Sequence, residues 1–401
     1  SNLIIWIGRE ELSMFFKNFI SQNVKGIEIS GIRKFYNKVA LYPGAISLTL
    51  GQPDFNVPEK IKAAMIKAIE ENKTTYTQNA GILELRTEIS NYLGNSGISY
   101  SPEEICITVG GSEALMDTFT SLINPGDKVL IPTPAYPAYE SCVKILGGMV
   151  INYNLKEDFS INFDELKKIL EDEKPKIIVL SYPSNPTGAV LSEEDNKKLF
   201  NLLHKQNILI ISDEMYSCLC FEENYYSIAQ HENIRDKIVL VGGFSKMFSM
   251  TGLRVGYVCA HPFIMNEIMK VHQYNVSCAP SVAQWGAYEG LVTCMEDVIY
   301  MKNEFIKRRD YIYHKLKSIG FDTNLPKGAF YIFPSIKNFS ANSEEFCEKL
   351  LKETGVAIVP GSAFGAGGEG YARISYAYSM DKLKLCMEKL DKWVNSLKIK
   401  S

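Results

Sequence analysis

The sequence lacks several features that would assign a chain to a class at once. No apolar stretch approaches the roughly 18 residues that a membrane-spanning helix needs. Neither sign of charge dominates, because 43 lysines and arginines stand against 46 aspartates and glutamates, a formal net charge of −3. Without a basic surplus we expect no nucleic-acid partner and no membrane association. The 401 residues also contain no internal repeat, low-complexity tract or flexible linker.

Paired cysteines are missing as well. The nine cysteines are scattered, and Cys218 and Cys220 are too close together for a CxxC site. We therefore expect reduced thiols in a cytoplasmic protein, and no metal site. The apolar run LIIWI at residues 3–7 is followed at once by GREE, which is the wrong order for a secretory signal. Residues 1–21 are interpreted as an N-terminal extension.

Short apolar runs alternate with helical patterns between about residues 104 and 260. The runs are rich in β-branched residues and continuous, which is typical of strands buried on both faces. They are EICITV, DKVLIP, MVINY, KIIVLS, NILIIS, KIVLVG and GLRVGYVCA. Helical patterns at 162–171 and 192–205 begin with the capping residues Asn162 and Ser192. This alternation predicts an α/β fold with a mainly parallel sheet and helices on both faces.

The pattern changes after residue 300. Helices are expected at roughly 296–318, 342–353 and 380–397. Between them lie three strand-like segments, GAFYIFP, VAIVPG and RISYAY. Because strands and helices do not simply alternate here, the sequence predicts a smaller α+β unit.

Polar residues follow the buried strands at the points where ligands bind in such sheets. The segment GGSEALMD after the first strand can offer free N–H groups to an anion. Asn185 follows KIIVLS, Asp213 and Tyr216 follow NILIIS, and Lys246 follows KIVLVG. Since ligands bind beyond the carboxyl ends of parallel strands, we expect these groups to meet at one edge of the sheet.

Each residue also has an ordinary structural interpretation. Asp213 could cap the next helix, Asn185 could start a turn before Pro186, and Lys246 could form a buried ion pair with Asp213. The presence of all these groups at one edge is harder to explain by structure alone, because burying each of them costs free energy of desolvation.

One chemistry uses the whole set. A lysine in a dry site loses its charge easily and attacks carbonyl groups. With pyridoxal phosphate (PLP) as the carbonyl compound, a carboxylate would face the pyridine nitrogen and an amide and a phenol would bind the ring oxygen. The glycine-rich helix start and Arg254 would hold the phosphate.

These residues resemble the class I/II aminotransferases, which are PLP enzymes of fold type I. The resemblance extends from about residue 30 to the end of the chain. The matching motifs are GQPDF (51–55), YTQNAGILELR (76–86), VGGSEAL (109–115), PAYPAY (134–139), SNPTG (184–188), SDEMY (212–216), SKMFSMTGLRVGY (245–257) and RISYA (373–377). One departure is Gly243, where many relatives carry a serine or threonine that contacts the phosphate.

The resemblance implies a role for each matching position. The catalytic residues would be Lys246, which holds the cofactor covalently and moves the proton, with Asp213 and Tyr216. Cofactor contacts would come from Gly111, Ser112, Glu113, Tyr136, Asn185, Asp213, Tyr216, Ser245, Lys246, Arg254 and, across a homodimer interface, Tyr76. Substrate contacts would come from Gly51, Asn185 and Arg373, the last as a clamp for the α-carboxylate.

The resemblance also implies an organisation of the chain. A large PLP domain with a seven-stranded sheet would span residues 60–300. A small α+β domain would be built from both ends, residues 22–59 and 301–401. The expected partners are amino acid and 2-oxo acid substrates and a second copy of the chain.

The implied reaction moves an amino group from an L-amino acid to a 2-oxo acid in two stages, through pyridoxamine phosphate. The substrate stays open between aspartate, aromatic and broad specificity. A PLP-dependent carbon–sulfur lyase is an alternative, because it would use the same lysine, aspartate and arginine. GAGGEG at 365–370 fits the pattern of a nicotinamide-binding loop, but a strand follows where that motif requires a helix, so a dehydrogenase is rejected.

Overall fold

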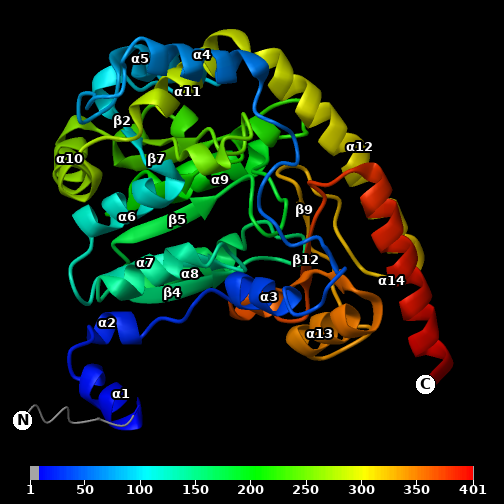
Figure 1. Cartoon of the computed structure of the whole chain (residues 1–401). Coiled ribbons are helices and arrows are strands. Elements are labelled where there is room, and N and C mark those ends of the chain that lie inside the picture. Colours follow the sequence, from blue (N-terminus) through cyan, green and yellow to red (C-terminus); the bar gives the residue numbers. More distant parts are fainter. Residues whose placement is uncertain (1–8, 401) are drawn as a thin grey trace, which may run out of the picture.

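A seven-stranded sheet forms the centre of the computed structural model, which describes residues 9–400 (Figure 1). In spatial order its strands are β2 (Ile105–Thr108), β8 (Gly256–Cys259), β7 (Ile238–Gly243), β6 (Leu209–Asp213), β5 (Ile177–Ser181), β3 (Lys128–Thr133) and β4 (Met149–Asn154). Only β8 runs antiparallel to its neighbours. All seven predicted strands are confirmed. The LIIWI run lies outside the described residues.

Helices cover both faces of this sheet, as continuous apolar strands require. In β5 the side chains of Ile178 and Leu180 join one core, and those of Ile177 and Val179 join the other. The first core is covered by α4 (Glu59–Glu70), α5 (Leu83–Gly94), α8 (Phe163–Glu173), α9 (Glu193–Leu203) and α11 (Ser281–Thr293). The second is covered by α6 (Gly110–Leu122), α7 (Ala138–Ile145) and α10 (Pro262–Val276).

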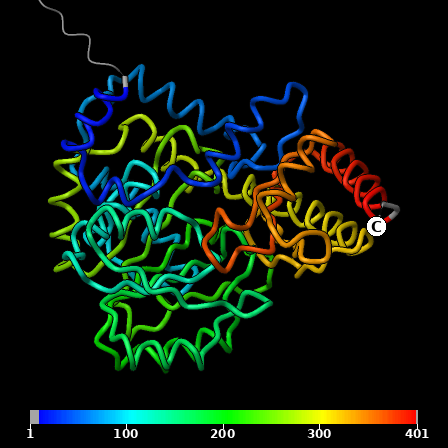
Figure 2. The backbone as a smooth tube through the Cα atoms, turned by 90° about the horizontal axis from the view of Figure 1, so that it is seen from below, coloured from blue at the N-terminus to red at the C-terminus, as the bar shows by residue number. Residues whose placement is uncertain are grey.

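A third core lies in the C-terminal part of the chain, together with a segment from near the N-terminus. Its elements are α3 (Gly31–Val39), β1 (Ile46–Ser47), α12 (Met295–Ile319), β9 (Tyr331–Ile332), α13 (Ser343–Thr354), β10 (Val356–Ala357), β12 (Ala372–Ser375) and α14 (Met380–Lys400). β11 (Val359–Pro360) belongs to the same part of the chain, but Val359 joins a separate small cluster. β1 pairs in parallel with β10, and β12 pairs antiparallel with β11 and β9. Figure 2 shows the blue N-terminal segment beside the orange C-terminal segment.

The predicted helices of this part are confirmed, but its strands are shorter than predicted. GAFYIFP contributes only Tyr331–Ile332 to a strand.

In the main sheet, GLRVGYVCA also begins later than predicted, because a 3₁₀ turn occupies Thr251–Leu253 and Arg254 has the left-handed φ of 55°. Arg254 therefore lies before β8, not within it.

Two short helices, α1 (Arg9–Lys17) and α2 (Gln22–Lys25), precede α3 and extend from the body of the molecule (Figure 1). Among residues 9–400, none of the helices has both the length and the apolar character required to cross a membrane.

Candidate active site

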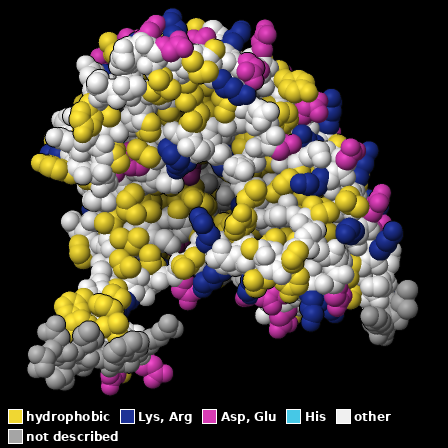
Figure 3. Space-filling view, viewed as in Figure 1, with side chains coloured by type: hydrophobic (Ala, Val, Ile, Leu, Met, Phe, Trp, Pro, Cys, Tyr) yellow, Lys and Arg dark blue, Asp and Glu magenta, His cyan; other side chains and the backbone are white. Residues whose placement is uncertain are grey.

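A cavity of about 650 Å³ lies at the carboxyl ends of β5, β6 and β7, a volume typical of small-molecule sites. Figure 3 shows the surface hollowed near its centre, with Lys or Arg side chains at the rim. The cavity wall includes every predicted site residue except Glu113 and Tyr76. These residues are Gly51, Gly111, Ser112, Tyr136, Asn185, Asp213, Tyr216, Ser245, Lys246, Arg254 and Arg373.

Lys246 follows β7, and its side chain enters this cavity. Its Nζ donates a hydrogen bond to the carbonyl oxygen of Gly51. Burial, with the nearby charges of Arg373 and Arg254, lowers the pKa of the amine to about 8. A lysine at this position therefore reaches its neutral, nucleophilic form at a far lower pH than a surface lysine does.

Asp213 ends β6 on the same side of the sheet. One carboxylate oxygen accepts a hydrogen bond of 2.5 Å from the Tyr139 hydroxyl, and the other accepts one of 3.1 Å from the backbone N–H of Met215. Burial raises the pKa of Asp213, while these two donors and the charge of Lys246 oppose the rise. Asp213 and Lys246 thus take separate hydrogen-bond partners, which does not fit a simple ion pair between them.

Arg373 is 1% exposed and comes from β12 of the C-terminal part. Its Nη1 donates to Asn185 Oδ1 at 2.8 Å, and its Nη2 donates to the Thr49 carbonyl oxygen at 2.7 Å. Its Nε has no hydrogen-bond partner in the described part of the chain. The guanidinium is therefore held in place yet keeps donor capacity for an anion such as a carboxylate.

The hydroxyls of Tyr216 and Tyr331 lie 2.7 Å apart at the wall of the same cavity. The Tyr331 hydroxyl also lies 2.8 Å from the position that a Cβ at Gly51 would occupy. A side chain at position 51 would therefore collide with the Tyr331 hydroxyl of this pair.

The N-terminus of α6 and Arg254 together form a positively polarised corner. Gly110 has a φ of 68°, and a Cβ on it would lie 2.4 Å from Arg254 Nη2. The Arg254 Nη1 donates to the Thr251 carbonyl oxygen at 2.8 Å, which directs the guanidinium toward the helix start. Free N–H groups and an adjacent cation make this corner suited to a phosphate.

At Gly243, the departure from the family pattern, the space for a side chain is occupied by a neighbouring residue. A Cβ at this position would lie 2.9 Å from both Sδ and Cε of Met215. The Met215 side chain therefore occupies the space in which a serine or threonine would sit, which gives this departure a steric reason.

Sequence reasoning missed Tyr139 and Arg33. Tyr139 donates to Asp213, and Arg33 lies on the cavity wall from α3. Tyr139 was within reach of a sequence argument, since it belongs to the same PAYPAY segment as Tyr136, and the two rings lie 5.7 Å apart. For Arg33, the family resemblance placed residues 22–36 at the substrate entrance, but the sequence alone did not show which of their side chains point into it.

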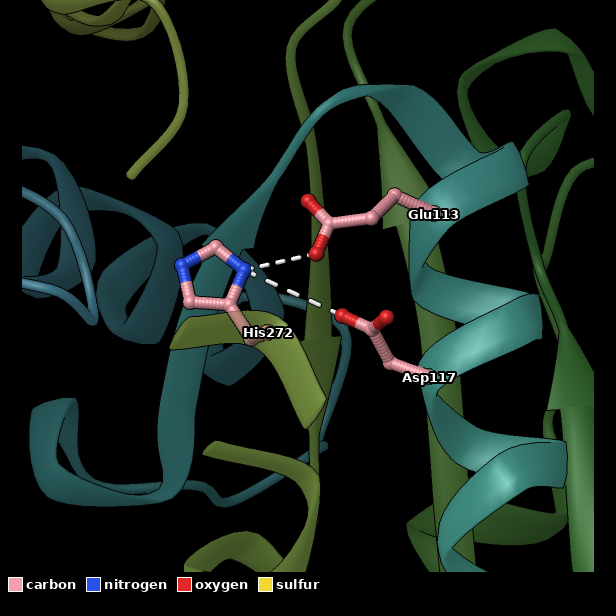
Figure 4. Close-up of side chains that lie close together, drawn as sticks. All are labelled: Glu113, Asp117 and His272. Atoms are coloured by element: carbon pink, nitrogen blue, oxygen red, sulfur yellow. Dashed lines mark hydrogen bonds and ion pairs between the residues drawn. The ribbon is translucent and has the colours of Figure 1, made fainter. Parts of the chain in front are cut away.

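The side chain of Glu113 turns away from the cavity into a second cluster, shown in Figure 4. His272 on α10 lies 2.6 Å from Glu113 through Nδ1 and 2.6 Å from the Asn79 carbonyl oxygen through Nε2. Asp117, one turn further along α6, is fully buried, and one of its carboxylate oxygens lies 3.8 Å from the same Nδ1.

These contacts determine which atoms of the second cluster carry protons. A carbonyl oxygen only accepts, so Nε2 carries hydrogen, and Nδ1 carries hydrogen because it faces a carboxylate. Burial lowers the pKa of His272, but Glu113 outweighs it and leaves that pKa raised. Burial and the neighbouring Glu113 raise the pKa of Asp117. Ligand atoms of the three residues lie within 4.8 Å of one another, close enough for a metal ion, and the raised pKa of Asp117 favours its neutral form beside Glu113.

Tyr76 lies outside the cavity of its own chain and is 84% exposed.

Comparison with known proteins gives a consistent result. Residues 43–390 match the family description "Aminotransferase class I and II". The chain is 44% identical over 383 residues to a probable N-acetyl-LL-diaminopimelate aminotransferase of Bacillus subtilis, covering 94% of this chain and 96% of that one. It is 37% identical to an aspartate aminotransferase of Pyrococcus abyssi, covering 95% and 99%. A solved aromatic aminotransferase of Pyrococcus horikoshii superposes with a TM-score of 0.86 at 37% identity, covering 91% and 99%.

Proposed function

The chain belongs to the class I and II aminotransferase family, and on this premise we propose that its cavity binds pyridoxal phosphate, attached covalently at Lys246. The protein is an aminotransferase, and we propose an L-amino acid and a 2-oxo acid as its substrates, used in turn at this one site. The observation that carries the proposal is a buried amine of lowered pKa that shares a cavity with Asp213 and Arg373.

The residues around the cavity fit the cofactor in three places. The corner formed by Gly111, Ser112 and the backbone N–H of Glu113, with Ser245 and Arg254, would hold the phosphate. Asp213 would face the pyridine nitrogen, where its buried carboxylate would gain the positive partner that it lacks. The Asn185 amide and Tyr216 hydroxyl would bind the ring oxygen, and Tyr136 would cover the ring.

When bound, pyridoxal phosphate supplies an electron-withdrawing ring that stabilises negative charge on the substrate α-carbon. The chain supplies the positioning and the proton transfer. Arg373 would bind the α-carboxylate, with Asn185 and Thr49 fixing its guanidinium. The Lys246 Nζ would take the proton from the α-carbon and return it, a task for which a pKa near 8 suits it.

The reaction type is tested by mixing the holoenzyme with single amino acids and no oxo acid. We expect each good donor to change the cofactor absorbance once per site and to release its own 2-oxo acid, which a second oxo acid then reverses. Release of pyruvate and ammonia from cysteine-like substrates without an acceptor would instead indicate the lyase. No spectral change with any common amino acid would contradict both.

We further propose a homodimer in which Tyr76 reaches the phosphate site of the partner. Tyr76 is highly exposed in its own chain and is accompanied by further exposed apolar residues, including Ile66, Ile69, Leu83 and Tyr274. Figure 3 shows hydrophobic side chains gathered over the region where Figure 1 draws α4, α5 and α11. An apolar surface of this kind is typical of an interface.

Mixed dimers test this assignment. A Y76A chain paired with a K246A chain would form one complete site if Tyr76 acts across the interface, because the intact tyrosine and the intact lysine then meet. We expect co-refolded chains to recover activity above that of either variant alone. No recovery, with heterodimers verified by mass, would place Tyr76 in its own site or outside both.

Two further assignments remain proposals. We propose that residues 22–59 and 301–401 form a small domain against a large domain of residues 60–300, a division supported by the separate C-terminal core. We also propose the cytoplasm as the location, since all nine cysteines are free thiols.

A further inference from the structure

The start of α6 lacks a polar N-cap side chain. Its N-cap residue is Val109, and two glycines, Gly110 and Gly111, follow. The first turn is instead closed by Glu113, whose Oε1 accepts a hydrogen bond of 2.7 Å from the Val109 backbone N–H. Because glycine backbones are flexible, the shape of the proposed phosphate corner depends on where the Glu113 carboxylate is held.

His272 holds that carboxylate from the side of α10. Its Nδ1 donates to Glu113 Oε2 at 2.6 Å, so the two oxygens of Glu113 join the helix start to α10 (Figure 4). The imidazole is fully buried, and the Glu113 side chain is 9% exposed. Water therefore has little access to compete for this contact, and the position of the carboxylate follows that of His272.

The same imidazole also holds the segment that carries Tyr76. Its Nε2 donates to the Asn79 carbonyl oxygen at 2.6 Å. The Asn79 side chain donates in turn to the Ser277 carbonyl oxygen at 2.7 Å, just beyond the end of α10. Tyr76 precedes Asn79 by three residues and is the side chain proposed to reach the phosphate site of the partner. One buried side chain thus contacts two segments that the proposed function assigns to phosphate binding.

We propose that His272 is a positioning residue for the cofactor phosphate. It fixes the start of α6, which binds the phosphate in its own chain, and the segment that brings Tyr76 to the phosphate of the partner. This inference rests on the proposed function, including its dimer, and adds a residue that lies outside the cavity wall. An ion pair that served only stability would leave the affinity for the phosphate group unchanged, so the two roles predict different results.

Pyridoxal separates these roles, because it has the ring and aldehyde of pyridoxal phosphate but no phosphate. We expect H272Q to weaken the binding of pyridoxal phosphate to the cofactor-free protein by about 10-fold, the range for losing a charge-assisted contact, and to leave the dissociation constant of pyridoxal within about twofold. Glutamine carries neither the charge nor the second ring nitrogen, so it does not bridge Glu113 and Asn79 as the imidazole does. Absorbance titrations measure both dissociation constants.

Two further variants keep a loss of stability apart from a loss of positioning. N275A removes the 2.9 Å hydrogen bond from Asn275 to Asp117, which also joins α10 to α6 but does not reach the helix start. It should leave the ratio of the dissociation constants, pyridoxal over pyridoxal phosphate, within about twofold of the wild-type ratio. E113Q/H272Q removes both buried charges and should regain stability, yet its ratio should stay low because the bridge is still missing.

The outcomes distinguish this inference from the proposed function. Equal weakening of both ligands in H272Q, no weakening of either, or the same loss in N275A would overturn the inference and leave the proposed function standing. A wild-type protein that binds pyridoxal phosphate no more tightly than pyridoxal would contradict the proposed phosphate corner, and the inference with it.

Mixed dimers test the contact with Asn79. A chain that carries both H272Q and K246A, paired with a wild-type chain, leaves one site with a lysine. The His272 of that site is intact, and its Tyr76 comes from the variant chain. We expect this site to release its cofactor about threefold to tenfold faster than the same site in a dimer of K246A and wild type. Equal release rates would overturn the part of the proposal that concerns the partner.

Discussion

Two buried clusters of charge lie close together in this molecule and have opposite characters. The cavity cluster, Lys246, Asp213 and Arg373, lines the open cavity, and the Nε of Arg373 has no hydrogen-bond partner within residues 9–400. The enclosed cluster, Glu113, Asp117 and His272, is surrounded by the chain itself, and its imidazole has both nitrogens occupied (Figure 4). Both clusters remove charged groups from water, but only the first lines an open cavity, while in the second one carboxylate oxygen of Asp117 has no partner among the described residues.

The two clusters show how a buried charge can be assigned to function or to stability. Desolvating a charge costs free energy, which an internal partner can offset within the fold. In the enclosed cluster, Glu113 and His272 supply that partner for each other. In the cavity cluster the compensation is incomplete, so the pKa of Lys246 falls and that of Asp213 rises. Changes in the cavity should therefore affect activity, and changes in the enclosed cluster should affect stability.

The largest effect is expected for K246A. Losing both the covalent anchor and the proton carrier should lower kcat by about 10⁴-fold or more. Urea unfolding of the cofactor-free protein should show no loss of stability, because a buried amine of lowered pKa does not stabilise the fold. K246M, which fills the same space, is the matched control. Substantial activity in both variants would remove Lys246 from the reaction.

The second largest effect is expected for D213N. The amide keeps the shape but removes the negative charge that the proposed pyridinium would face, so kcat should fall by about 10²- to 10³-fold. Single-turnover absorbance measurements with the best amino acid donor would report the loss. D213E retains the charge and should lose less, and equal rates for D213N and wild type would contradict the assigned role.

Substitutions in the enclosed cluster should instead change the stability of the folded protein. H272Q leaves Glu113 buried without its cation, which should lower the free energy of unfolding by about 3 kcal/mol. The double variant E113Q/H272Q removes both charges and should recover part of that loss. Urea unfolding at pH 6 measures this, because the raised pKa of His272 makes its contribution complete at low pH and lost as the pH rises through that pKa. A stability equal to that of the wild type would show that the pair contributes nothing.

The smallest effect is expected for the pH dependence of the reaction between Lys246 and pyridoxal phosphate. Below about pH 8 the amine of the cofactor-free protein is mostly charged, so its rate of capturing pyridoxal phosphate should fall about tenfold per pH unit. The rate should level off above pH 8. Its effect on stability runs opposite to that of His272, since a lowered lysine pKa makes the fold more stable as the pH rises from about 8 toward 10.5. A rate that still climbs steadily at pH 10 would contradict the lowered pKa.

Local sequence patterns predicted the elements well, and for a clear reason. Continuous apolar runs identified all seven strands of the main sheet, since strands buried on both faces admit few polar residues. Capping residues such as Ser192 located helix starts. Arg254 was placed inside a strand because its neighbours are apolar, whereas its left-handed φ depends on the turn that directs it toward Gly110.

The sequence by itself determined the fold class, the order of the strands along the chain, and which chemical groups follow the strand ends. Only the tertiary structure decided that Tyr139 holds Asp213, that Met215 fills the space at Gly243, that Glu113 faces His272 and that Arg33 lines the cavity. The physical reason is that local and non-local interactions determine different properties. Backbone conformation and burial follow from neighbours in the chain, whereas contacts between side chains of different elements follow from how the finished elements pack.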